Sequence, residues 1–182
     1  MDNLFTINSV SESGHYRAVI EIPAGTNRKM EINKASGAFE PSLRNGKPRL
    51  IDFLPYPINY GFVPGTLMDK ERGGDGDPLD VLLICESLPM GTLIEFLPVA
   101  VLRLSDTDEL DSKILAVPVN PELRTICATN YHELNEWYSA IKEIILIWFL
   151  NYDKRNDTTQ FIKWDDDQLA IEEIEKWRRI KE

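Results

Sequence analysis

The sequence predicts an α+β fold, a small closed β-barrel with flanking α-helices. Two observations lead to this expectation. Apolar and alternating runs typical of strands fill the first part of the chain, and a helical period of 3.6 residues appears only afterwards. With 182 residues the chain has the length of one domain, so we expect residues 1–182 to form a single domain.

Strand-like segments follow one another before any helical pattern appears. The alternating or continuously apolar runs are residues 16–22, 29–33, 79–85, 92–104 and 113–119. Pro98 inside the fourth run predicts a bulge or an edge position, because proline cannot donate to a neighbouring strand. Glycine and proline punctuate residues 36–48, which indicates a loop or a hairpin.

The helical pattern begins at Asn130. This residue can cap a helix, with Glu133 three positions on as the partner of a capping box. Apolar residues follow at helical spacing: Leu134, Trp137, Ile141, Ile144, Ile145 and Trp148. A second helix is expected from about Asp166 to the end of the chain, with acidic residues in its first turn and basic residues in its last.

Composition excludes several classes of function. The chain carries 20 Lys and Arg against 30 Asp and Glu, a net charge of −10, so we expect no nucleic-acid partner and no anionic membrane surface. No apolar run reaches the roughly 20 residues of a membrane span, and the first residues lack the pattern of a secretory signal. Two cysteines and two histidines form neither a disulfide framework nor a zinc motif. We therefore expect a soluble, cytoplasmic protein.

An acidic segment before the third strand carries the clearest chemical signal. Asp75, Asp77 and Asp80 lie within six residues, with Gly76 and Pro78 between them. Crowded carboxylates repel one another unless a cation neutralises them, and hard oxygen ligands suit Mg²⁺, Mn²⁺ or Ca²⁺. The glycine and proline imply a bend that brings Asp75 and Asp80 together. The alternative is a solvated acidic turn.

Further charged and aromatic residues supply a counterpart. A second acidic group occupies residues 105–113, and a third consists of Glu21 and Glu31 near Lys29; either can be an ordinary solvent-facing set. Tyrosine hydroxyls and cationic side chains are suitable donors to phosphate oxygens, and the candidates are Lys29, Arg49, Tyr56, Tyr60 and Lys113. Carboxylates facing such donors, without a His or Cys nucleophile, suggest metal-assisted phosphoryl transfer to water.

The run Asp-Gly-Asp-Pro-Leu-Asp-Val at residues 75–81, preceded by Asn-Tyr-Gly-Phe-Val-Pro-Gly-Thr at residues 59–66, closely resembles the soluble family I inorganic pyrophosphatases. The resemblance extends over residues 21–152. It implies an OB-like β-barrel with helices packed outside. It also implies an inorganic diphosphatase, a hydrolase that uses Mg²⁺, with Mn²⁺ as a substitute, to convert pyrophosphate to two orthophosphates.

The resemblance also implies a role for each site residue. Asp75, Asp80 and Asp111 would hold the tightest activating metal, and Asp80 would bridge to a second ion that shares the attacking water or hydroxide. Asp77 would be the general base. Further ions would meet Asp106, Asp111 and Glu31, with Glu21 as support. The phosphates would be held by Lys29, Arg49, Tyr60, Lys113 and Tyr152, with Tyr56 lining the site.

The chain departs from the family pattern after Tyr152. Asp153 stands where the family commonly has lysine, and Lys154 follows. Either Lys154 reaches the leaving phosphate from one residue along, or that contact is lost. The long loop at residues 36–48 makes Arg44 a competitor of Arg49 for the phosphate-binding position.

Two other functions remain open from the sequence. One is a catalytically silent phosphate- or metal-binding module, which Asp153 favours and Asp77 opposes. The other is a hydrolase of organic diphosphates. The family further implies a homo-oligomer, commonly a hexamer. Tyr138, Ile147 and Trp148 on the long helix are candidates for the interface, with core packing as the alternative.

We expect Lys154→Ala to weaken substrate binding, because the departing phosphate would lose a cationic donor. A steady-state measurement of KM for pyrophosphate tests this, and an unchanged KM would count against it.

Overall fold

The computed structural model describes residues 4–107, 109–153 and 158–179. Short 3₁₀ turns, strands and two α-helices alternate along the chain. In order they are η1 (Leu4–Thr6), β1 (Tyr16–Ile22), β2 (Met30–Ile32), β3 (Phe39–Pro41), β4 (Leu43–Arg44), β5 (Lys47–Pro48), β6 (Asn59–Phe62), η2 (Lys70–Arg72), β7 (Asp80–Leu83), β8 (Leu93–Asp106), β9 (Glu109–Pro118), η3 (Pro121–Leu123), α1 (Tyr131–Phe149), β10 (Thr159–Asp165) and α2 (Asp167–Trp177).

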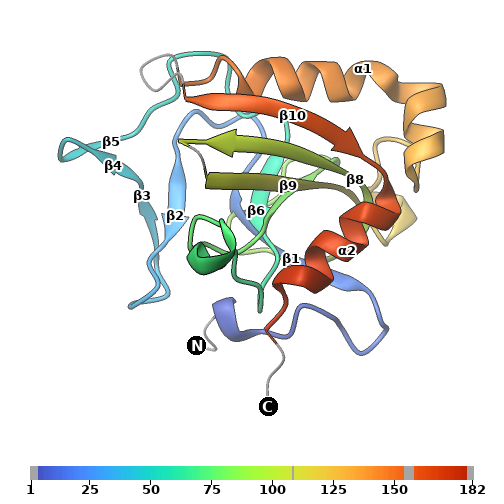
Figure 1. Cartoon of the computed structure of the whole chain (residues 1–182), viewed down its shortest axis with the longest axis horizontal. Coiled ribbons are helices and arrows are strands. Elements are labelled where there is room, and N and C mark those ends of the chain that lie inside the picture. Colours follow the sequence, from blue (N-terminus) through green and yellow to red (C-terminus); the bar gives the residue numbers. More distant parts are fainter. Residues whose placement is uncertain (1–3, 108, 154–157, 180–182) are drawn as a thin grey trace.

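Five strands pair in a ring. β1 pairs antiparallel with both β6 and β8, β6 pairs with β7, and β9 lies between β7 and β8. The β7–β9 pair is parallel, and the other pairs of the ring are antiparallel. β10 adds a sixth strand alongside β8 (Figure 1). The expected α+β arrangement is therefore present as a mixed sheet containing a ring of five strands, with two α-helices.

The strands of the ring are buried on both faces. Leu82 of β7 and Leu115 of β9 belong to one apolar cluster, together with the inner face of α1. Val81 and Ile114, their neighbours in sequence, belong to a second cluster with α2. Side chains alternate across a strand, so a strand covered on both sides needs a continuous apolar run. This explains the hydrophobic run at residues 81–85 of the third predicted strand.

Several sequence expectations about strands need correction. The acidic group at residues 105–113 lies between the expected strands 92–104 and 113–119, but the β8–β9 pairing extends into it, to Asp106 opposite Glu109. Strands β6 and β10 were not predicted. Their polar and glycine-containing sequences lack a clear period, and pairing with longer neighbours stabilises them instead. The bulge predicted at Pro98 is confirmed by a register shift between Pro98 and Ala100.

The predicted cap of α1 is confirmed, and α2 has a cap that was not predicted. Asn130 accepts a hydrogen bond from the Glu133 N–H at 2.9 Å, and Asp166 accepts one from the Leu169 N–H at 2.9 Å. The helix α2 ends at Trp177, so Arg178 lies beyond its last turn. None of the helices within the described residues is long and apolar enough to cross a membrane.

The apolar face of α1 differs from the one that the spacing predicts. Non-helical backbone angles at Tyr138 (φ −139°, ψ 32°) interrupt the helix and rotate its two halves relative to one another. Trp137 and Ile144 are exposed, and the buried face includes Ile145 and Trp148. Trp148 therefore belongs to the core rather than to an exposed interface.

A buried charge network joins β8, β10 and α2. Arg103 of β8 donates to Asp165 at 2.5 Å and to Glu173 at 2.6 Å. The Glu173 side chain is 4% exposed and also accepts from the Trp177 indole at 2.7 Å. Burial alone would raise the pKa of Glu173 and of Asp165, but hydrogen bonds and the charge of Arg103 hold both below their usual values.

We expect Arg103→Met to lower the free energy of unfolding by about 3–5 kcal/mol, because it leaves Glu173 buried without its cation. The control is Lys163→Met, which removes the exposed partner of Asp165 and should cost less than about 1 kcal/mol. Denaturant unfolding measures both.

The difference between wild type and Arg103→Met should shrink below about pH 4. Carboxylates whose folded-state pKa is depressed stabilise the fold above their ordinary pKa and lose that contribution as the pH falls through the depressed value. A constant difference between pH 7 and pH 3 would contradict this account.

Candidate active site

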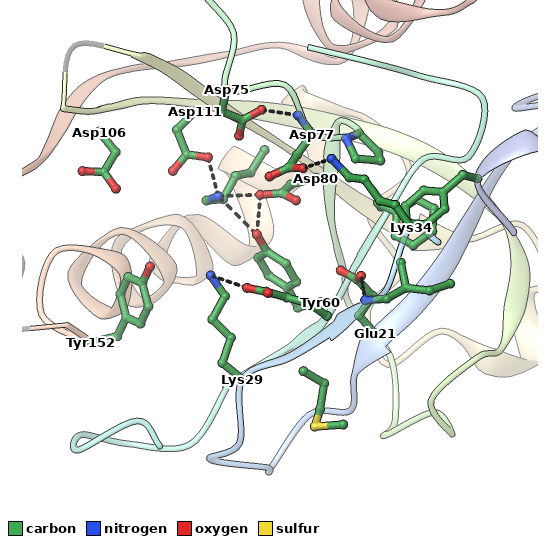
Figure 2. A pocket seen from close by; sticks show the side chains of 17 residues that line it. Glu21, Lys29, Lys34, Tyr60, Asp75, Asp77, Asp80, Asp106, Asp111 and Tyr152 are labelled. Carbon is green, nitrogen blue, oxygen red and sulfur yellow. Dashed lines mark hydrogen bonds and ion pairs between the residues drawn. The ribbon is translucent and has the colours of Figure 1, made fainter. Parts of the chain in front are cut away.

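A buried ammonium group lies at the centre of the site. The parallel register places Lys113 of β9 directly beside Asp80 of β7, and Asp111 lies two residues before Lys113 on the same face of β9. The Lys113 Nζ atom donates to Asp80 and to Asp111, each at 2.7 Å (Figure 2). Its side chain is 5% exposed. Burial alone would lower the pKa of Lys113, but the two carboxylates raise it above the ordinary value, so the ammonium stays protonated.

Tyr60 of β6 completes this centre. Its hydroxyl donates to Asp80, and the Lys113 ammonium lies 5.5 Å from the Tyr60 ring centroid. Gly61, the next residue, is required for this placement. A Cβ atom there would come within 1.9 Å of the Val19 carbonyl oxygen on β1. Only glycine lets the two strands approach so closely, and their pairing orients Tyr60 toward the acids.

An aromatic column supports the wall of the site. The Tyr56 ring contacts Tyr60 edge-on at 5.7 Å and Trp148 at 4.6 Å, and Trp148 stacks on Tyr152 at 4.7 Å. Tyr56 itself is buried, which raises the pKa of its hydroxyl. Tyr56 therefore packs behind the site and does not line it, whereas Tyr152 does.

The acidic turn before β7 brings two more carboxylates to the same place. Gly76 has a φ of +85°, and its N–H donates to the Met68 carbonyl at 2.8 Å. Asp75 accepts from the Asp77 N–H at 2.8 Å, which closes the turn. Burial, with a smaller effect of the neighbouring negative charges, raises the pKa of Asp75 to about 6. The bend expected between Asp75 and Asp80 is thus present, and both residues line one pocket.

Asp77 has a partner that sequence reasoning missed. Lys34, in the turn after β2, donates to the Asp77 carboxylate at 2.5 Å and to the Gly76 carbonyl at 3.1 Å. Both side chains of the pair are exposed, 58% for Lys34 and 61% for Asp77. Nothing in the local pattern distinguishes Lys34 from a solvent-facing lysine, because the contact joins residues 43 positions apart.

The N-terminal strands form the opposite wall. Glu21 of β1 accepts from the Ile32 N–H at 3.0 Å, and burial raises the pKa of Glu21 to about 8. Lys29 lies 3.5 Å from Glu31. At the end of β8, Asp106 accepts a hydrogen bond from the Thr158 hydroxyl.

Together these residues enclose a cavity of about 300 Å³. Eleven of the sequence-predicted residues line it: Glu21, Lys29, Glu31, Tyr60, Asp75, Asp77, Asp80, Asp106, Asp111, Lys113 and Tyr152. Sequence reasoning missed the other lining residues, which are Phe5, Met30, Ile32, Lys34, Phe62 and Pro78. Lys154 lies outside the described residues.

Arg49 is not part of the cavity wall. Its guanidinium donates to Asp153 at 2.8 Å, and Arg44 donates to the same carboxylate at 2.9 and 2.5 Å. The two competing candidates for phosphate binding therefore share one acidic partner. Both guanidinium groups are thus paired with the residue that directly follows Tyr152 in the chain.

The carboxylates that line the cavity suit a hard divalent cation, but they do not form a preformed metal site. Within the described ranges, no three His, Cys, Asp or Glu residues are grouped closely enough to hold a metal ion. Asp80 and Asp111 are instead bridged by the Lys113 ammonium. Carboxylate oxygens are nevertheless the preferred ligands of Mg²⁺ and Mn²⁺, and Asp75, Asp80 and Asp111 line the same cavity.

An oxygen-rich acidic pocket that faces lysine and tyrosine donors defines the class of metal-assisted phosphate hydrolases. The family model for inorganic pyrophosphatase matches residues 18–181. The chain therefore belongs to the inorganic pyrophosphatase family, and the resemblance to its family I members is confirmed.

Individual relatives agree with this assignment. The chain is 33% identical to the inorganic pyrophosphatase of Neisseria meningitidis serogroup B, over 92% of each chain. It is 39% identical to that of Aeropyrum pernix, over 74% of this chain and 70% of the relative. Among solved structures, the inorganic pyrophosphatase of Thermus thermophilus has a TM-score of 0.79 at 27% identity, covering 95% of both chains. A Coxiella burnetii inorganic pyrophosphatase has a TM-score of 0.78 at 30% identity, covering 94% of this chain and 97% of the other.

We expect Lys113→Met to lower the free energy of unfolding by about 3 kcal/mol in EDTA, because Asp80 and Asp111 lose their cation. Added Mg²⁺ should then raise the melting temperature more for this variant than for wild type, since the ion can neutralise the same carboxylates.

Lys29→Met is the matched control, because it removes a lysine that lines the same cavity and pairs only weakly with Glu31. It should cost less than about 1 kcal/mol. An equal Mg²⁺-induced shift in wild type and in Lys113→Met would contradict the arrangement.

Proposed function

We propose that this chain is an inorganic diphosphatase that hydrolyses pyrophosphate to two orthophosphates with a divalent cation. The observation that carries the proposal is the convergence of carboxylates from β7, β9 and the preceding acidic turn on one cavity with Lys29, Lys113 and Tyr60. The size of the cavity, about 300 Å³, suits a small anion.

The metal is Mg²⁺, with Mn²⁺ as a chemically acceptable substitute. Asp75, Asp80 and Asp111 would hold the tightest ion. Asp106, Glu31 and Glu21 would hold or support the others. When bound, the ions neutralise the charge of the phosphate oxygens and lower the pKa of a coordinated water.

The protein's own side chains would supply the general base and the donors to the phosphate oxygens. The Asp77 carboxylate, half-open to solvent and held by Lys34, would accept the proton of the attacking water as general base. Lys29, Lys113, Tyr60 and Tyr152 would donate to the phosphate oxygens, and the cations among them would stabilise the departing phosphate.

Arg49 keeps the substrate-binding role as a proposal, although it does not line the cavity, and so does Lys154, which lies outside the described residues. Arg49 would have to exchange its Asp153 partner for a phosphate oxygen. Tyr56 would act from behind the wall, through its contact with Tyr60.

A catalytically silent phosphate- or metal-binding module is the second candidate. The pairing of Arg44 and Arg49 with Asp153 favours it, because these guanidinium groups already have an anionic partner. An organic diphosphate is less well accommodated, since it would need apolar surface for its organic part and the cavity wall is mainly charged.

The broader assignments also belong to the proposal. We expect residues 1–182 to act as a single domain and the ring of five strands to be an OB-like β-barrel. We also expect a cytoplasmic homo-oligomer, with a hexamer favoured by the family resemblance, and neither nucleic acid nor membrane as partner. The net charge of −10 and the two free cysteines support these expectations.

The test is phosphate release from pyrophosphate with Mg²⁺ and with EDTA, for wild type and for Asp77→Asn. We expect rapid release in Mg²⁺, none in EDTA, and a loss of about 10²–10⁴-fold in kcat for the variant, because the amide cannot accept the proton.

Asp52→Asn is the matched control, since Asp52 is exposed and lies outside the cavity. It should retain the wild-type rate. A folded wild type that binds Mg²⁺ but releases no phosphate would favour the silent module.

A further inference from the structure

A short hairpin presents two arginines toward one carboxylate. Arg44 ends β4, and Arg49 follows β5. Positive φ angles at Asn45 (52°) and Gly46 (73°) make the tight turn between the strands, and the Arg49 N–H donates to the Ser42 carbonyl at 2.8 Å. These contacts define the backbone of the β4–β5 hairpin (Figure 1), from which both arginine side chains extend.

Asp153 occupies both guanidinium groups at once. Arg44 donates to the carboxylate from two nitrogens, at 2.9 and 2.5 Å, and Arg49 adds a third hydrogen bond at 2.8 Å. The Asp153 side chain is only 14% exposed and that of Arg49 19%, so water screens this cluster less than an ordinary surface pair. Hydrogen bonds and charge from Arg44 lower the pKa of Asp153, which keeps it anionic.

The cluster adjoins the cavity through two neighbours. Tyr152, which precedes Asp153, lines the cavity. The Arg49 carbonyl accepts a hydrogen bond at 3.1 Å from the N–H of Lys29, another lining residue. A phosphate group bound beside Tyr152 and Lys29 would therefore feel the charge of an arginine pair that already holds an anion.

A carboxylate and a phosphate compete for the same arginine geometry. The planar guanidinium fork binds either group through two parallel hydrogen bonds. Two arginines and one aspartate carry a net charge of +1 rather than +2. The Asp153 carboxylate therefore reduces both the number of free donors and the positive potential that a phosphate would meet.

We propose that Asp153 is an affinity-determining residue, a built-in carboxylate that occupies the Arg44–Arg49 pair and weakens the binding of phosphate groups at the Tyr152 side of the cavity. The proposal rests on the proposed function for its consequence in catalysis, which is faster loss of the phosphate product. The occupancy of the arginine pair itself is independent of that function.

The test is calorimetric titration of the full chain with inorganic phosphate in Mg²⁺, for wild type, Asp153→Asn and Asp153→Glu. The asparagine variant keeps the shape but loses the charge, so both arginines are held more weakly and can turn to the ligand. We expect phosphate to bind about fivefold more tightly, the ratio that corresponds to about 1 kcal/mol for one partly exposed ion pair. Asp153→Glu retains a carboxylate and should stay near wild-type affinity.

Two controls separate this effect from general changes. Glu136→Gln removes one negative charge from the exposed face of α1 and should leave phosphate affinity unchanged. In an Arg44→Met background the gain from Asp153→Asn should fall by at least half, because one of the two released guanidinium groups is missing. Circular dichroism and the melting temperature establish that each variant is folded.

Pyrophosphate kinetics provide the second measurement. Asp153→Asn should lower KM and lower the inhibition constant of phosphate by similar factors, without a matching rise in kcat. Unchanged or weaker phosphate binding by a folded Asp153→Asn would overturn the proposal even if wild type hydrolyses pyrophosphate. A wild type without hydrolysis whose asparagine variant binds phosphate more tightly would instead refute the proposed function and support the role of Asp153.

Discussion

The site depends on one buried ammonium group. Without a cation, Asp80 and Asp111 would face each other in a partly dry pocket, and their repulsion would oppose the pairing of β7 with β9. The Lys113 ammonium resolves this conflict from within the sheet, since its own strand pairs with β7 at that position. Under the proposed function a divalent ion would find its oxygen ligands at the same position, and Lys113 would then couple stability to metal affinity.

The rest of the architecture holds this centre in place. The close approach of β1 and β6 at Gly61 fixes Tyr60 beside Asp80. The stacked aromatic rings between Tyr60 and Tyr152 pack the end of α1 against the cavity. Charges at the rim are arranged in opposed pairs, Lys34 with Asp77 and Arg49 with Asp153. A strongly anionic substrate would have to compete with the protein's own carboxylates for these cations, and this competition would weaken substrate binding.

The sequence predicted the parts of this structure that local chemistry determines. The acidic turn at Asp75 and the helix cap at Asn130 follow from glycine, proline and capping preferences, and the family motif brought most lining residues together. Contacts between distant segments that the family motif does not include could not be predicted. No local pattern shows that Lys34 reaches Asp77, and the charge at Asp153 was read as a lost lysine rather than as the partner of two arginines. The rotation of α1 was likewise invisible, because helical spacing assumes an unbroken helix.

The most direct measurement is anomalous diffraction from crystals soaked in Mn²⁺. The account predicts an anomalous peak bounded by Asp75, Asp80 and Asp111, with the Lys113 ammonium displaced from at least one of its two carboxylates. A peak elsewhere on the molecule, with Lys113 still bonded to Asp80 and Asp111 and an empty cavity, would contradict it.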